Sequence, residues 1–117
     1  MKCIIAGGRT FNDYELLESV MNDLKSKSIN ITTIISGCAP GADSLAIKYA
    51  EENNIELMKF PANWRKFGRS AGFKRNAEMG NHADMLIAFW NKKSRGTKHM
   101  IGIGIEKELL IKVVNYE

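Results

Sequence analysis

Glycine-rich segments with arginine beside them are the part of this chain best suited to chemistry. They are Gly7-Gly8-Arg9-Thr10-Phe11, Ser36-Gly37-Cys38-Ala39-Pro40-Gly41-Ala42-Asp43 and Ser94-Arg95-Gly96-Thr97. Glycine lets the backbone approach an oxyanion closely and leaves N–H groups free to point at it. A helix N-terminus adds unpaired N–H donors and the positive end of a dipole. Arg9 and Arg95 could complete such a site with forked hydrogen bonds to phosphate.

These loops match no common nucleotide-binding pattern. None fits GxGxxG or GxxxxGK[ST], so neither an ordinary dinucleotide fold nor a P-loop ATPase is indicated. A single glycine after a strand is usually only a turn, but three such loops at one sheet edge favour anion binding. Asp43 has two interpretations. It caps or charge-matches the helix that follows, or it accepts hydrogen bonds from ribose hydroxyls.

The charge of the chain is basic and clustered. The formal net charge is +4. One group comprises Arg65, Lys66, Arg69, Lys74 and Arg75, with no acid among them, and a second comprises Lys92, Lys93, Arg95 and Lys98. We interpret them as two cationic segments that face an anion, and the alternative is a role in solubility alone.

Other side chains near these segments have two interpretations each. Trp64 and Trp90 either pack at the rim of the core or stack on a base and cap the site. Arg75 is the better phosphate candidate at the start of its helix, and Asn76 binds either the ligand or the backbone. No acidic or Cys/His cluster indicates a metal site. We therefore expect no metal or cofactor, except Mg²⁺ brought by a phosphate ligand.

The elements that position these residues alternate between strands and helices. Five continuous apolar runs predict strands covered on both faces: Lys2–Ala6, Ile31–Ser36, Ile55–Phe60, Asp84–Phe89 and Ile111–Asn115. Four helical patterns separate them: Asp13–Lys27, Ala42–Asn53, Ser70–His82 and Thr97–Leu110. The alternation predicts a single α/β domain over residues 1–117, with a five-stranded parallel sheet between two helical layers. Ligands of such sheets bind beyond the carboxyl ends of the strands.

Composition excludes several classes of protein. The longest apolar runs, Cys3–Ala6 and Met85–Trp90, are far shorter than the roughly 20 residues that span a bilayer. We expect no signal peptide, because only four apolar residues follow Lys2 before Gly7, and the two cysteines form no motif. We therefore expect a cytoplasmic protein with no membrane partner.

The motifs resemble those of the short stand-alone, YspA-like members of the SLOG superfamily, which includes the LOG phosphoribohydrolases and the DNA-processing protein DprA (Smf). The resemblance rests on Gly7-x-Arg9-x-Phe11, on Ser36-Gly37-x-Ala39-x-Gly41-Ala42-Asp43 and on three later motifs. Those are Pro61-Ala62-x-Trp64, Ala71-Gly72-x-x-Arg75-Asn76, and Ala88-Phe89-Trp90 with Ser94-Arg95-Gly96-Thr97. It implies a Rossmann-like fold with strand order 3-2-1-4-5 and a cavity over strands one and four. It also implies a homo-oligomer and a nucleotide-type ligand such as a nucleoside monophosphate or an ADP-ribose derivative.

The resemblance leaves the activity open. LOG enzymes cleave an N-glycosidic bond with an arginine in an R-x-x-x-M motif, which Arg75–Met79 fits, and a glutamate in G-T-x-x-E. Here Met100 stands in place of that glutamate, and a thioether cannot act as a base, so Glu78 or Asp43 would have to substitute. Our leading interpretation is a module that senses or sequesters a nucleotide-derived ligand. The alternatives are a LOG-like hydrolase and a binder of single-stranded nucleic acid in the manner of DprA.

Overall fold

The computed structural model describes residues 1–117 and contains one five-stranded sheet. All neighbouring strands are parallel, and their order is β3-β2-β1-β4-β5, which confirms the expected Rossmann-like topology. The strands are β1 (Lys2–Gly7), β2 (Thr33–Ser36), β3 (Glu56–Lys59), β4 (Met85–Trp90) and β5 (Leu110–Asn115).

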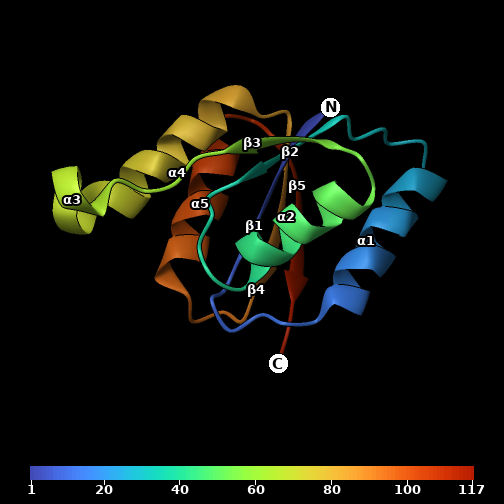
Figure 1. The fold of residues 1–117 in the computed structure, drawn as a ribbon, viewed down its shortest axis with the longest axis horizontal. Coiled ribbons are helices and arrows are strands. Elements are labelled where there is room, and N and C mark those ends of the chain that lie inside the picture. Colours follow the sequence, from blue (N-terminus) through green and yellow to red (C-terminus); the bar gives the residue numbers. More distant parts are fainter.

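Helices cover both faces of the sheet (Figure 1). One face carries α1 (Tyr14–Ser26) and α2 (Ala42–Glu52), and the other carries α4 (Ala71–His82) and α5 (Arg95–Glu106). The short helix α3 (Trp64–Phe67) and the 3₁₀ turn Gly68–Ser70 precede α4 and extend away from the sheet.

Two separate cores explain the continuous apolar runs in the central strands β1 and β4. On β1, Cys3 and Ile5 face the core beneath α1 and α2, whereas Ile4 and Ala6 face the core beneath α4 and α5. Because side chains alternate across a strand, a strand buried on both faces needs apolar residues throughout. The two layers hold β1 and β4 rigidly at the centre of the sheet, where the register pairs Gly7 with Phe89.

The structure differs from the predicted elements mainly at their ends. The last helix stops at Glu106 and not at Leu110, because Glu108 takes a left-handed conformation (φ 58°) before β5 begins. The segment between β3 and α4 contains helix α3, whose first turn is capped by Asn63 through a 3.0 Å bond from the Lys66 N–H. None of the helices has the length and apolar character needed to cross a membrane.

Candidate functional site

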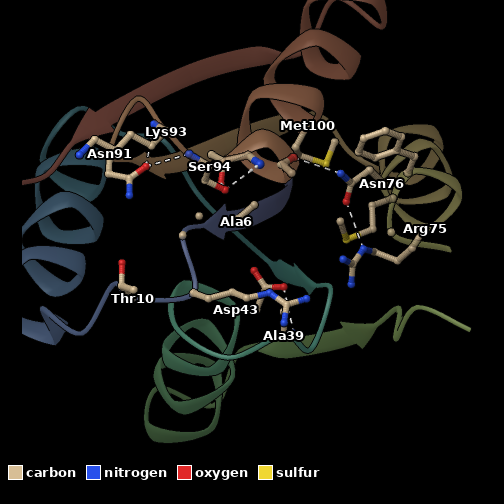
Figure 2. A pocket seen from close by; sticks show the side chains of 18 of the residues that line it. Ala6, Thr10, Ala39, Asp43, Arg75, Asn76, Asn91, Lys93, Ser94 and Met100 are labelled. Atoms are coloured by element: carbon tan, nitrogen blue, oxygen red, sulfur yellow. Dashed lines mark hydrogen bonds between the residues drawn. The ribbon is translucent and has the colours of Figure 1, made fainter. Parts of the chain in front are cut away.

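A cavity of about 510 Å³ opens at the carboxyl ends of β1 and β4. It is bounded by the β1–α1 loop, the β2–α2 loop, the α3–α4 segment and the β4–α5 loop (Figure 2). The lining residues are Ala6, Gly7, Gly8, Arg9, Thr10, Ala39, Asp43, Trp64, Arg69, Gly72, Phe73, Arg75, Asn76, Met79, Asn91, Lys93, Ser94, Gly96, Thr97 and Met100.

The β1–α1 loop contributes free backbone donors, although not at the residues that glycine content alone suggests. The Gly8 N–H donates to the Phe89 carbonyl (3.1 Å), so it is not free for a ligand. The next two N–H groups, of Arg9 and Thr10, have no acceptor within the protein. A Cβ at Gly8 would meet the Tyr116 hydroxyl, so that ring would have to shift to admit any other residue.

The β2–α2 loop is held by Asp43 and Ser36. Asp43 Oδ2 accepts the Ala39 N–H (3.1 Å), and the buried Ser36 hydroxyl donates to the Asp43 carbonyl (3.0 Å). The side chain of Asp43 makes no capping bond to α2, whose N-cap is Gly41. Gly41 has φ 84°, a conformation that side chains disfavour, and its Cβ would meet the backbone of Gly8 and Arg9. Gly41 therefore lets the β1–α1 and β2–α2 loops pack against each other.

Asp43 is the only carboxylate that lines the cavity, and it is 6% exposed. Burial raises the pKa of this carboxyl to about 6, although the Ala39 N–H and the charges of Arg75 and Arg9 act in the opposite direction. Neither arginine forms an ion pair with the Asp43 carboxylate. The only ion pair in the structure joins Lys27 and Asp23. The cations around the cavity are therefore not neutralised by the protein's own acids.

Helix α4 presents Arg75 in a fixed orientation (Figure 2). The Arg75 Nη1 donates to the Gly37 carbonyl, and its Nε donates to Asn76 Oδ1 (3.1 Å). The Asn76 amide in turn lies 3.2 Å from His99 Nδ1 and donates to the Gly96 carbonyl (3.3 Å). This chain of bonds ties α4 to the start of α5. Burial lowers the pKa of His99, which favours the neutral ring that accepts from Asn76.

The β4–α5 loop forms the third side of the cavity. Asn91 Oδ1 accepts the N–H groups of Lys93 and Ser94 (both 2.9 Å), and the Ser94 hydroxyl accepts the Thr97 N–H at the start of α5 (3.3 Å). The N–H groups of Arg95 and Gly96, in the first turn of α5, have no acceptor within the protein. A helix start with free N–H groups and Lys93 beside it has the chemistry of an anion site.

Two aromatic rings lie at the edge of the cavity. Trp64 is 51% exposed and packs near Gly72, and Phe73 is 49% exposed and stacks on His99 with ring centroids 4.1 Å apart. Arg69 also lines this side and is exposed. The cavity thus combines exposed rings and free cations at its rim with a buried carboxylate inside.

The predicted site residues fall into three groups. Those that line the cavity are Gly7, Gly8, Arg9, Thr10, Asp43, Trp64, Arg75, Asn76, Ser94, Gly96 and Thr97. Gly37 lines a smaller adjoining cavity of about 190 Å³ that shares Arg9, Ala39, Trp64 and Arg75 with the large one. The remaining predicted residues, Phe11, Ser36, Gly41, Ala42, Glu78, Trp90 and Arg95, line neither.

The residues outside both cavities have structural roles or lie on the surface. Phe11 is buried and stacks on Phe89 (4.4 Å between ring centroids). The Trp90 indole N–H donates to the Ser94 carbonyl (3.1 Å) and so shapes the β4–α5 loop. Glu78 is exposed on α4, and Arg95 lies in a shallow groove on α5.

Sequence reasoning did not single out Asn91 and Phe73. The signal for Asn91 was present, since asparagine after a strand commonly caps the backbone of the following turn. Phe73 carried no signal, because an aromatic residue in a helix usually points to a core. No group of three His, Cys, Asp or Glu side chains lies close enough to hold a metal ion.

A parallel sheet of order 3-2-1-4-5 with a cation-lined cavity over its central strands defines a Rossmann-like domain. Residues 1–67 match the family described as YAcAr, the YspA, cpYpsA-related SLOG family, and the chain belongs to that family. The matched range includes the β1–α1 and β2–α2 loops, whereas Arg75 and the β4–α5 loop lie beyond it.

The chain is also similar to the Gene 61 protein of Mycobacterium phage D29. The two are 31% identical over 104 residues, which cover 84% of this chain and 83% of the phage protein. The similarity to the phage protein therefore extends beyond the segment that the family match covers.

Proposed function

We propose that the cavity binds a nucleotide or nucleotide-derived ligand, and that the protein senses or sequesters it. The proposal rests on one observation: free backbone N–H donors and cations without an acidic partner lie around the same cavity. Free N–H groups come from Arg9, Thr10 and Gly96, and the cations are Arg9, Arg69, Arg75 and Lys93. An oxyanion with several acceptor atoms, such as a phosphate, satisfies both at once.

The rest of the cavity suits the other parts of a nucleotide. The exposed rings of Trp64 and Phe73 offer flat faces on which a base stacks. A volume of about 510 Å³ lies within the range of roughly 300–1,000 Å³ that small-molecule sites occupy. A nucleoside monophosphate and an ADP-ribose derivative both combine a base, a sugar and phosphate, so both belong to the proposed class.

Binding without cleavage is favoured by the residues near the cavity. Met100 lines it at the position where LOG enzymes carry glutamate, and Glu78 is exposed and lies outside it. A hydrolase is left with Asp43 as its only cavity carboxylate. Incubation with nucleotides followed by chromatography distinguishes the two functions, because a hydrolase releases free base whereas a binding module does not.

A single-stranded nucleic-acid binder is the second candidate, and helix α3 is the observation that favours it. Trp64 and Phe67 are 51% and 39% exposed there, beside the exposed cations Arg65, Lys66 and Arg69. Exposed rings and cations together form a stacking surface for a strand. This function predicts oligonucleotide affinity that falls steeply with salt and that is lost in Phe67→Ala, which leaves the cavity lining unchanged.

The proposed function is tested by titration calorimetry with a panel of ribonucleoside monophosphates and ADP-ribose. We expect at least one to bind wild-type protein, and Arg9→Gln or Arg75→Gln to weaken it by about tenfold or more, since charge-assisted hydrogen bonds are lost. Lys25→Gln is the matched control, because it removes one positive charge from the exposed surface of α1. No binding by wild type, or equal weakening in all three variants, contradicts the proposal.

The same proposal places the protein in the cytoplasm, where nucleotides are abundant. Both cysteines, Cys3 and Cys38, are free, as is usual in a reducing compartment.

A further inference from the structure

The carboxyl of Asp43 has an acceptor atom that the protein leaves unused. Its Oδ2 accepts the Ala39 N–H (3.1 Å), but Oδ1 accepts no hydrogen bond from any protein group. The residue as a whole is 6% exposed, and it lines the cavity. No fully buried side-chain oxygen or nitrogen lacks a partner in this structure, so Oδ1 is the accessible oxygen of an otherwise buried residue, and it can accept a hydrogen bond from a ligand in the cavity.

The surroundings of Asp43 decide which part of a ligand could supply that donor. Phosphate carries acceptors and negative charge, so an ionised carboxylate repels it. The base would stack on the exposed rings of Trp64 and Phe73 at the rim of the cavity. The sugar, which lies between base and phosphate in every nucleotide, carries hydroxyl donors and no charge. Figure 2 shows Asp43 on the α2 side of the opening, between Thr10 and Arg75 on the neighbouring elements.

We infer that Asp43 recognises the ribose hydroxyls of the ligand, so that the cavity selects ribonucleotides over 2′-deoxyribonucleotides. The inference rests on the proposed function and deepens it by naming the class of sugar. The free Oδ1 accepts from the vicinal diol, and Oδ2 remains bonded to the Ala39 N–H, which fixes the plane of the carboxylate. A site that hydrogen-bonds a hydroxyl discriminates against the analogue that lacks it, because the charge-assisted bond is lost and the bound ligand covers the acceptor without replacing that bond.

An ionised Asp43 accepts from ribose hydroxyls, whereas a protonated Asp43 would donate to phosphate. A change of pH distinguishes these two roles. The charged groups that face the carboxyl are Arg75 from α4 and Arg9 from the β1–α1 loop, and its own loop offers the Ala39 N–H. The carboxyl titrates near pH 6, where phosphate esters also titrate. The ratio of ribonucleotide to deoxyribonucleotide affinity is free of the phosphate's contribution, because both ligands carry the same phosphate.

The test is calorimetric titration of AMP, GMP, CMP and UMP against the 2′-deoxy form of each. For wild-type protein we expect the best ribonucleotide to bind about tenfold or more tightly than its deoxy form. The preference should fall toward unity in Asp43→Asn, and it should decline in wild type as the pH is lowered through 6. Glu51→Gln, an exposed acid on the same helix, is the matched control and should keep the preference.

Two results overturn the inference while leaving the proposed function intact. One is equal affinity of wild-type protein for the ribo and deoxy forms, and the other is a ribose preference that survives in Asp43→Asn. Absence of binding by both series overturns the proposed function, and the inference with it. The outcomes therefore distinguish a failure of the ribose inference from a failure of the proposed function.

Discussion

The carboxyl of Asp43 carries a cost to stability that its position in the cavity explains. Burial raises its pKa in the folded protein to about 6 from an ordinary 3.8. Because the folded-state pKa lies above the unfolded value, the folded state holds the proton more tightly. The stability contribution of this group is therefore complete below about pH 4 and is lost as the pH rises toward 6. Residues that oppose stability in this way are frequent at functional sites.

Asp43→Asn is expected to remove this cost. The variant should unfold at about the same denaturant concentration as wild type near pH 4 and should be more stable above pH 6. A shift of about two pKa units corresponds to at most about 3 kcal/mol. Denaturant unfolding at the two pH values measures the difference, and Glu51→Gln should show no such trend. A variant that loses stability relative to wild type as the pH rises would contradict the account.

At the scale of residues, the sequence predicted which polar and charged side chains line the cavity better than it predicted what each of them contacts. Arg9 and Asp43 were singled out by residue type and by place after a strand, and Arg75 by its place at the start of a helix, and all three line the cavity. The two interpretations of Asp43 could not be separated, because the choice depends on whether its oxygens face α2 or the loop. Phe11 shows the converse, since a motif position next to a glycine loop is filled by a ring that belongs to the core.

At the scale of elements, the three loops depend on side chains and glycines that lock them to one another. The Gly41 backbone lies against Gly8 and Arg9, and Asn91 binds two N–H groups of the β4–α5 loop. Strands and helices were predicted from continuous apolar runs and helical periodicity. Helix α3 was not, because four residues with no buried side chain produce no periodic pattern.

Gly41→Ala should destabilise the protein through this contact between loops. The residue has φ 84°, and a Cβ would collide with the Gly8 carbonyl oxygen, so we expect a loss of about 1–3 kcal/mol in the free energy of unfolding. Gly102→Ala is the control. A Cβ there meets no atom, and alanine inside a helix stabilises by about 0.5–1 kcal/mol. Thermal or denaturant unfolding gives both values, and an unchanged stability in Gly41→Ala would show that the loops do not pack as described.

At the scale of the whole molecule, the alternation of strands and helices indicates a parallel sheet, whereas the order 3-2-1-4-5 came from the resemblance to SLOG proteins. Local pattern could not supply that order, because it says nothing of which strand pairs with which. The structure confirms it, and the family match agrees. Homo-oligomer formation stays a prediction, since it depends on a second copy of the chain.

The central claim, that the β1–α1 and β4–α5 loops converge on one oxyanion, is tested most directly by backbone amide NMR during titration with AMP. The account predicts that the largest chemical-shift changes fall on the free N–H groups of Arg9, Thr10 and Gly96, at the carboxyl ends of β1 and β4. Small changes are expected for Lys98 and Gly102, which line only the shallow groove on α5. Changes spread over the charged surface, or concentrated in that groove, would contradict the account.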